Sequence, residues 1–325
     1  MLAPRENPVL FGHAEAEAAF AAAAASGRLH HAWLLTGAPG LGKATLAFRL
    51  ARLLLTREGD ANDPGNPVFR RIARGTHSDV LTIERATDLK TKKIKREITV
   101  DQVRDVAGFM HLTPAEGGWR VVVVDGLEDL NRNAANALLK ILEEPPKAAV
   151  LLLTSDAPGR LLPTIRSRCR QLRMEALDGA QMDAALRYLL ADKDAETRAG
   201  LIAVAEGAPG QAVAMADEGA LVLAGLAREM IAIPRLSTLR AYDVADRVTR
   251  GEGGFETFMT LLQAAVAGAV RTAARSGDHV LGRTPLAEWG EVWHALGHLH
   301  DETERFNLDK RTAVVAGLQM LPKVE

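Results

Sequence analysis

The chain has 325 residues, of which 47% are hydrophobic, so it is long enough for two or three domains of ~100–200 residues and for a sizeable core. Its formal net charge is −1, which excludes a polycation, so any contact with nucleic acid would be local or shared with partners. The single cysteine, Cys169, excludes internal disulfides and cysteine-built zinc sites, and no apolar run approaches the ~20 residues of a membrane span. We therefore expect a cytoplasmic protein with no membrane contact.

The first predicted elements are a helix over residues 14–25, ended by Gly27, and a strand over residues 32–35. His30 and His31 precede this strand, and paired histidines can indicate a metal site. No acidic or cysteine partner is spaced nearby, so we expect both to be structural and expect no metal ion.

Residues 31–55 carry the pattern of a phosphate-binding loop (P-loop), in which a strand leads through a glycine-rich turn into a helix. The turn reads Gly37-x-x-Gly40-x-Gly42-Lys43, and Lys43 opens a segment with helical apolar spacing. The glycines let backbone N–H groups converge on an anion, the helix N-terminus adds its positive dipole end, and the lysine adds a full charge. The alternative is a glycine turn into a buried helix that binds no ligand.

Position 44 departs from this pattern, because a Ser or Thr hydroxyl after the lysine normally ligates Mg²⁺ and this chain has Ala44. Thr45 lies one residue further, and one step along a helix turns a side chain by ~100°, so we expect it to point elsewhere. The loop is therefore predicted to hold phosphate, as vestigial ATP or ADP binding at most, with poor provision for the metal.

Residues 57–75 mix glycine, proline and charged residues and are predicted to be a surface excursion. A short strand over residues 80–83 precedes a basic loop, and a helix over residues 100–110 follows it. The basic residues of the loop include Lys92, Lys93, Lys95 and Arg96. The loop is either a solvated surface loop or a hairpin that contacts the phosphates of DNA.

The next strand, over residues 119–125, contains four consecutive valines and is predicted to be buried on both faces, as in a parallel sheet. Asp125 ends it where nucleotide-binding folds place the acid that holds Mg²⁺. In members that hydrolyse nucleotide a glutamate follows, whereas this chain has Gly126, and Glu128 cannot be assumed to replace it. The alternative role for Asp125 is a helix N-cap.

A helix with an apolar face over residues 134–142 ends at Glu143-Glu144-Pro145-Pro146, and a second buried strand then leads into Thr154-Ser155-Asp156. Three arginines alternate further on, at Arg166, Arg168 and Arg170. They form either a basic surface turn or a site from which one arginine reaches a neighbouring subunit's nucleotide and stabilises transferring phosphate charge.

From residue 176 onward strand patterns disappear and the chain is predicted to be helical, with one small unit over residues 176–216 and a second over residues 220–325. The second unit carries apolar stripes, which are more typical of a core or a subunit interface than of a cofactor site.

Four stretches together resemble the clamp-loader branch of the AAA+ ATPases: Gly37 to Lys43, Val121 to Asp125, Asn136 to Pro146 and Leu162 to Cys169. This resemblance implies an α/β N-terminal AAA+ domain over residues 1–174, with a P-loop and a parallel sheet flanked by helices. It further implies a small helical lid over residues 175–218 and an all-α C-terminal collar domain over residues 219–325. It also gives Thr154 and Ser155 a sensor-like role.

In three departures from the pattern of active members, the chain resembles the delta-prime family of bacterial DNA polymerase III clamp loaders. These departures are Ala44, Gly126, and Gly207-Ala208-Pro209-Gly210, where active members carry a nucleotide-sensing arginine. Arg168 of the Ser-Arg-Cys motif is intact. The resemblance implies a catalytically silent stator of the DNA-directed DNA polymerase holoenzyme, which offers Arg168 in trans to the ATP of an adjacent gamma/tau-type subunit.

Further partners implied by this resemblance are the delta subunit, the sliding clamp and primer–template DNA. Many relatives carry a four-cysteine zinc module after the P-loop helix, but residues 57–75 contain no cysteine, so we expect no zinc. Two enzyme classes compete with the stator: an active AAA+ ATPase, as a clamp-loader motor or helicase-type ring subunit, and a small-substrate kinase. Ala44 and Gly126 count against the first, and the long helical region has no role in the second.

Overall fold

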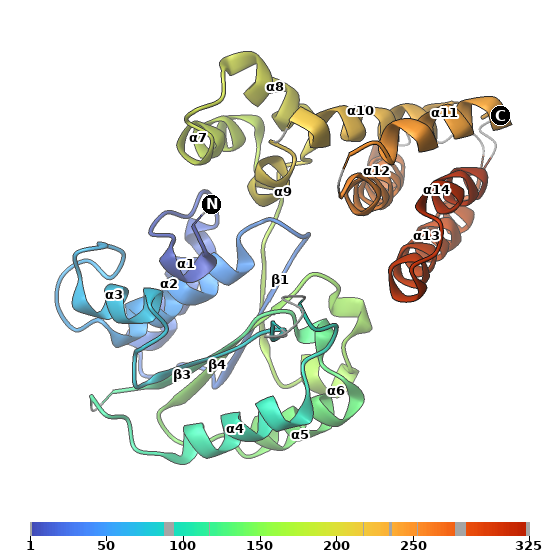
Figure 1. Ribbon diagram of the computed structural model, residues 1–325. Coiled ribbons are helices and arrows are strands. Elements are labelled where there is room, and N and C mark those ends of the chain that lie inside the picture. The colour runs from blue at the N-terminus through green and yellow to red at the C-terminus, as the bar shows by residue number, and fades with distance from the viewer. Residues whose placement is uncertain are drawn as a thin grey trace. The chain divides into compact units, whose positions relative to one another are not determined.

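The computed structural model describes residues 2–87, 94–116, 118–216, 218–233, 236–251, 253–276 and 284–322 (Figure 1). The chain forms two compact units. The first comprises Met1–Ala191 and Gly207–Gln211, and the second comprises Asp192–Glu206 and Ala212–Glu325. The division into three domains, at residues 1–174, 175–218 and 219–325, is not tested by this grouping and stays a prediction.

Within the described part of the first unit, five strands form one parallel sheet in the order β2-β3-β4-β1-β5. The strands are β1 (Ala32–Thr36), β2 (Val80–Ile83), β3 (Arg120–Val124), β4 (Ala149–Ser155) and β5 (Arg170–Arg173). Thr36 lies beside Ser155 and Val124 beside Leu153, so the carboxyl ends of β1, β3 and β4 meet at one edge of the sheet. The predicted parallel sheet with flanking helices is confirmed.

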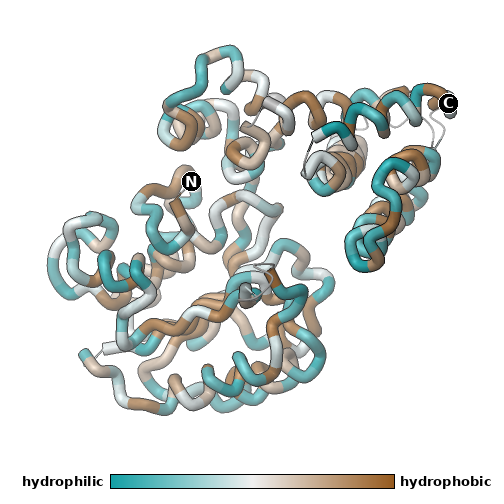
Figure 2. Tube along the Cα trace, in the orientation of Figure 1, coloured by the Kyte–Doolittle hydropathy of each residue, from teal (hydrophilic) through white to brown (hydrophobic). Residues whose placement is uncertain are grey.

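Helices cover both faces of the sheet. Successive side chains of a strand point to opposite faces, so the largely apolar strands have apolar residues to bury on each face. The helices of this unit are α1 (Ala14–Ala25), α2 (Lys43–Leu55), α3 (Pro67–Ala73), α4 (Val100–His111), α5 (Arg132–Glu143), α6 (Pro163–Arg166) and α7 (Gly179–Leu189). Val121 and Val123 pack with apolar residues of α1, α2 and α3, whereas Val122 and Val124 pack with those of α4 and α5. Each of these valines is at most 1% exposed, and Figure 2 shows the apolar strands enclosed between the helices.

The segment after α2 is more ordered than a surface excursion, since it contains α3. The side chain of Asn66 caps this helix by accepting a hydrogen bond from the N–H of Val68 at 2.9 Å, and Pro67 suits the first turn. Phe69 and Ile72 are buried, at 4% and 2% exposure. The surrounding glycines, prolines and charges concealed this short apolar face, so the prediction was wrong for α3.

Strand β5 forms one edge of the sheet, and most of it faces solvent. Arg170, Gln171 and Arg173 are exposed. The guanidinium carbon of Arg170 lies 4.7 Å from the centre of the buried Trp33 ring, so the arginine stem and head cover an aromatic residue of the core.

The described part of the second unit is helical. Its helices are α8 (Ala195–Val204), α10 (Glu218–Ala232), α11 (Thr238–Val248), α12 (Gly254–Ser276), α13 (Leu286–Phe306) and α14 (Lys310–Gln319), while α9 (Pro209–Ala214) straddles the boundary between the units. Leu262, Val266, Trp289 and Leu296 have 0% exposure, so the predicted stripes form much of the core of this unit. Across all the described ranges, none of the helices combines the length and apolarity needed to cross a bilayer.

Candidate functional site

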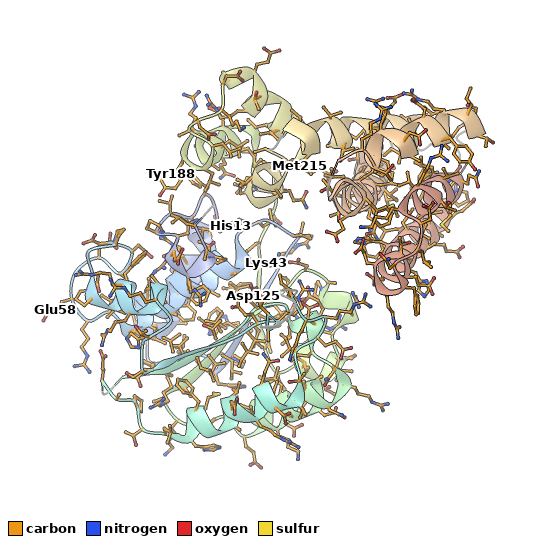
Figure 3. All side chains as sticks on the ribbon, viewed as in Figure 1. His13, Lys43, Glu58, Asp125, Tyr188 and Met215 are labelled. Carbon is orange, nitrogen blue, oxygen red and sulfur yellow. The ribbon has the colours of Figure 1, made fainter. Side chains whose placement is uncertain are left out.

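The predicted P-loop lies between β1 and α2, and its lysine binds the loop itself. Lys43 is the first residue of α2 and is 6% exposed (Figure 3). Its Nζ donates to the carbonyl oxygens of Gly37 at 3.0 Å and Ala38 at 2.6 Å. It also pairs with Oδ1 of Asp156, just after β4, at 2.5 Å. Sequence reasoning placed Lys43 here but missed Asp156 as its partner.

The two positions after Lys43 differ in their exposure. Thr45 is 8% exposed, whereas Ala44, which has no side-chain oxygen, is half-buried. Thr45 is the third residue of α2, one helical step of ~100° from position 44, where the metal-ligating hydroxyl normally stands. Poor provision for a metal ion at this loop stays a prediction.

Asp125 and Thr154, at the ends of neighbouring strands, are in direct contact. The Thr154 hydroxyl donates to Oδ1 of Asp125 at 2.6 Å and accepts from the N–H of Gly126 at 3.0 Å. Thr154 and Ser155 are 2% and 0% exposed. Asp125 does not cap the helix that follows, because the side chain of Asn131 caps α5. The threonine therefore fixes the Asp125 carboxylate at the edge of the sheet.

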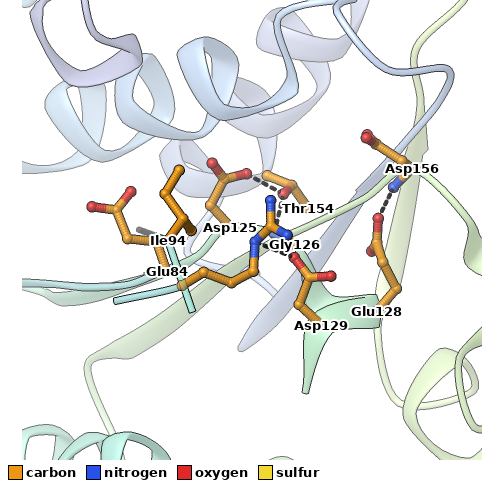
Figure 4. Close-up of a pocket in the computed structure, with 9 residues that line it drawn as sticks. Glu84, Ile94, Asp125, Gly126, Glu128, Asp129, Thr154 and Asp156 are labelled. Atoms are coloured by element: carbon orange, nitrogen blue, oxygen red, sulfur yellow. Dashed lines mark hydrogen bonds and ion pairs between the residues drawn. The ribbon is translucent and has the colours of Figure 1, made fainter. Parts of the chain in front are cut away.

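A pocket of about 260 Å³ opens beside Asp125 (Figure 4). Its lining residues are Glu84, Arg85, Ile94, Asp125, Gly126, Glu128, Asp129, Thr154 and Asp156. Nε of Arg85 pairs with Oδ2 of Asp129 at 3.1 Å, and burial still raises the pKa of Asp129 above its ordinary value. Since five of these lining residues are acidic and one is basic, the wall of this pocket disfavours a polyphosphate.

Gly126 has a backbone conformation that a glutamate could adopt only with strain. Its φ is +81°, and a Cβ built there would lie 2.7 Å from Oδ2 of Asp129. A non-glycine residue in this left-handed region costs about 1–2 kcal/mol. Glu128 is committed elsewhere, because its Oε1 accepts a hydrogen bond from the N–H of Asp156 at 2.8 Å (Figure 4). A side chain at position 126 would therefore be strained, and the Glu128 carboxylate is held by the backbone of Asp156.

Arg168 follows α6 and lies at the surface of the first unit. Its side chain is 36% exposed. One terminal nitrogen, Nη1, donates to the carbonyl oxygen of Thr164 at 3.0 Å, and the other, Nη2, pairs with Oε1 of Glu143 at 3.0 Å. Both contacts are made within the chain, and Glu143 is itself 49% exposed. Glu143 ends α5, so the two motifs that the sequence singled out separately meet at this arginine.

The neighbours of Arg168 have different environments. Nη1 of Arg166 donates to the carbonyl oxygen of Pro158 at 3.1 Å, and Arg170 lies over Trp33. Cys169 is partly buried, and this burial raises the pKa of its thiol to about 12. Of the three alternating arginines, Arg168 is the one that pairs with a carboxylate of α5, that of Glu143.

The stretch Gly207-Ala208-Pro209-Gly210 lies against the P-loop. The N–H of Gly210 donates to the carbonyl oxygen of Gly40 at 2.8 Å, and Nε2 of Gln211 donates to that of Pro39 at 3.2 Å. This contact was not predicted from the sequence, because its two sides are about 170 residues apart and no local sequence pattern indicates it.

The predicted DNA-contacting residues are described only in part. Lys92 and Lys93 lie outside the described residues. Lys95 and Arg96 are exposed, and the N–H of Lys95 donates to the carbonyl oxygen of Ala86 at 2.8 Å. Contact with DNA stays a prediction.

The histidines before β1 are engaged locally. The rings of His30 and His31 stack with centroids 4.3 Å apart, and Nδ1 of His30 lies 2.8 Å from the carbonyl oxygen of Ala32. In the ranges that the structure covers, no group of three or more histidine, cysteine or acidic side chains is arranged to hold a metal ion.

Comparisons with known proteins give a family model that falls within the first unit and relatives that match about half of the chain. A family model described as DNA polymerase III, delta subunit, matches residues 12–178, about half of the chain. DNA polymerase III subunit delta′ of Pseudomonas aeruginosa is 42% identical over 181 residues, which are 55% of this chain and 53% of that protein. DNA polymerase III subunit tau of Escherichia coli is 36% identical over 166 residues, which are 50% of this chain and 24% of that protein.

The matched region thus spans about half the length of the first relative and about a quarter of the second. Among solved structures, the RuvB Holliday junction branch migration motor of Thermotoga maritima is 16% identical, with a TM-score of 0.47, over 95% of this chain and 88% of that one.

Proposed function

Since this chain belongs to the family described as DNA polymerase III, delta subunit, we propose that it is a catalytically silent stator subunit of a DNA polymerase III clamp loader. Its task is DNA replication in the cytoplasm, where the complex loads the sliding clamp onto primed DNA. Its partners are gamma/tau-type ATPase subunits and a delta subunit, and it reaches the clamp and primer–template DNA through the complex. It supplies Arg168 in trans to the nucleotide of a neighbouring ATPase subunit.

The observation that carries this proposal is the placement of Arg168. A guanidinium has five N–H donors, and the two contacts to Thr164 and Glu143 leave others available. The ion pair with Glu143 is exposed, so it is weak and can exchange for a stronger pair with phosphate. The guanidinium of Arg168 is thus oriented and exposed, and it can leave Glu143 at a small cost in free energy. These properties suit an arginine that pairs with the triphosphate bound to another subunit.

Catalytic silence is supported at three positions. Ala44 has no hydroxyl for the metal, Gly126 has a left-handed backbone in place of a glutamate, and Gly210 packs on the P-loop where an arginine would sense nucleotide. The acidic pocket beside Asp125 adds an unfavourable field for a polyphosphate.

The test is reconstitution of the clamp loader with this chain as wild type or as Arg168→Ala. We expect the variant to assemble normally but to lower clamp- and DNA-stimulated ATP hydrolysis at the adjacent site by about 10³-fold, the size of an arginine-finger effect. Arg104→Ala is a matched control, since Arg104 is also an exposed arginine paired with a carboxylate of the same unit. Equal activity of the Arg168 and Arg104 variants in assembled complexes would refute the proposed role of Arg168.

The basic loop is proposed to contact DNA in the assembled complex. Charge reversal of Lys92, Lys93, Lys95 and Arg96 is expected to weaken DNA binding and to reduce its salt dependence. Binding titrations at two salt concentrations measure both quantities, and an unchanged salt slope would count against the loop.

An active ATPase is the second candidate, because the glycine loop, Lys43 and the Thr154–Asp125 contact are all in place. ATP turnover by the isolated chain separates the two candidates. We expect none, whereas turnover abolished by Lys43→Ala would favour the ATPase.

A further inference from the structure

A five-residue segment of the chain, Gly207–Gln211, is grouped with the first unit although the residues on both sides of it belong to the second. Three hydrogen bonds attach it. The N–H of Leu177 donates to the carbonyl oxygen of Gly207 at 2.9 Å, and Gly210 and Gln211 donate to the P-loop carbonyls of Gly40 and Pro39. The segment Gly207–Gln211 is therefore part of the first unit, where it contacts the P-loop.

The contact is made backbone to backbone and requires glycine on both sides. A Cβ at position 210 would lie 2.9 Å from both Cα and the carbonyl oxygen of Gly40. A Cβ at position 40 would lie 2.7 Å from the backbone nitrogen of Gln211, and the φ of Gly40 is +81°. Backbone atoms cannot move aside as a flexible side chain can, so an arginine at position 210 is incompatible with this arrangement.

The lysine of the loop is satisfied by the chain as well. An ammonium group has three N–H donors, and Lys43 has three acceptors: the carbonyl oxygens of Gly37 and Ala38 and the carboxylate of Asp156. The carboxylate also compensates its charge. A phosphate could bind Lys43 only by displacing one of these acceptors from a side chain that is 6% exposed.

A third part of the chain covers the start of α2. A Cβ at Gly42 would lie 3.0 Å from Cδ1 of Leu10, so the N-terminal segment packs closely on this turn of the loop. The P-loop thus contacts other parts of the chain at Gly40, at Lys43 and at Gly42, where it joins α2.

From these contacts we infer that the P-loop of this chain is an internal joint, whose ligands are the chain's own segment Gly207–Gln211 and the Asp156 carboxylate in place of a nucleotide. The joint fixes that segment on the first unit whether or not nucleotide is present. This inference goes beyond the proposed stator function and stands independently of Arg168.

Hydrogen exchange on the full-length chain tests the contact between Gly210 and Gly40. We expect the Gly210 amide to exchange at least about 10-fold more slowly than an unprotected amide, with no change when ADP is added. Gly210→Ala should remove this protection, whereas Gly108→Ala, at a helical glycine with no atom within 4 Å of a built Cβ, should leave it intact. If Gly210→Ala does not fold, the wild-type protection with and without ADP decides the question.

Pyrophosphate binding, measured by calorimetry, tests the lysine. We expect no binding by the wild type, and a gain of at least about 10-fold in affinity for Asp156→Asn, which vanishes in Asp156→Asn/Lys43→Met. Fast exchange of the wild-type Gly210 amide, or no gain in affinity for Asp156→Asn, would overturn the joint. Loss of activity in the Arg168→Ala complex bears on the stator alone, so the two proposals can fail separately.

Discussion

Gly126 offers a direct test of how much strain a side chain would introduce directly after Asp125. We predict that Gly126→Ala and Gly126→Glu both destabilise the first unit and that neither confers ATP turnover. The left-handed backbone at φ +81° contributes about 1–2 kcal/mol of strain for any side chain. The new Cβ, 2.7 Å from Oδ2 of Asp129, also displaces the oxygen that pairs with Arg85. That pair is partly exposed, so its loss adds at most about 1 kcal/mol.

The sum is about 1–3 kcal/mol, which corresponds to a fall of about 2–12 °C in the melting temperature for a unit of this size. Differential scanning calorimetry of the full-length chain measures the shift. Gly159→Ala is the matched control, because its built Cβ meets nothing within 4 Å and its φ is not positive, and we expect a change within about 0.5 kcal/mol. Equal melting temperatures for Gly126→Ala and Gly159→Ala would refute the strain argument.

Three further predictions concern buried and partly buried groups of the first unit. Arg52 is fully buried and donates to Asn62 and to two backbone carbonyls of the N-terminal segment, so Arg52→Met should lower the free energy of unfolding by about 3 kcal/mol in urea titrations; a loss below about 1 kcal/mol would contradict this. Cys169, with a thiol pKa of about 12, should react with iodoacetamide at pH 8 far more slowly in the folded chain than in urea, and equal rates would contradict its burial. Burial is the leading cause that lowers the pKa values of His13, His31 and His77 below 6.5, so the unfolded chain binds more protons there. Stability present above pH 6.5 should therefore be lost as the pH falls through these histidines' range, which urea midpoints at pH 7.5 and 5.5 would detect; a higher midpoint at pH 5.5 would show the opposite linkage.

The sequence predicted the elements whose signal is local. The four valines of β3 gave a strand buried on both faces, since each face meets its own set of helices. Gly37 to Lys43 gave the loop between β1 and α2, and Asp125 was placed correctly at the end of β3. These patterns are written in consecutive residues, so they can be read without knowledge of the fold.

Contacts between distant residues could not be predicted in this way. Asp156 pairs with Lys43, Glu143 holds Arg168, and Gly210 packs on Gly40, and each contact joins separate elements. Parallel strands bring their carboxyl ends together, which could have suggested Asp156 as a neighbour of the loop. Helix α3 was missed for a different reason, since its apolar face is only a few residues long.

The arginines of β5 have a consequence for how this chain meets other proteins. An edge strand has unpaired N–H and C=O groups, with which a strand of another chain can form hydrogen bonds. Cationic side chains on the edge strand disfavour this pairing. Arg170 and Arg173 place two positive charges on this strand, which should resist fibril-like growth through added strands. The proposed contact of Arg168 with a neighbouring subunit is instead made from the surface beside α5 and α6, away from pairing between strands.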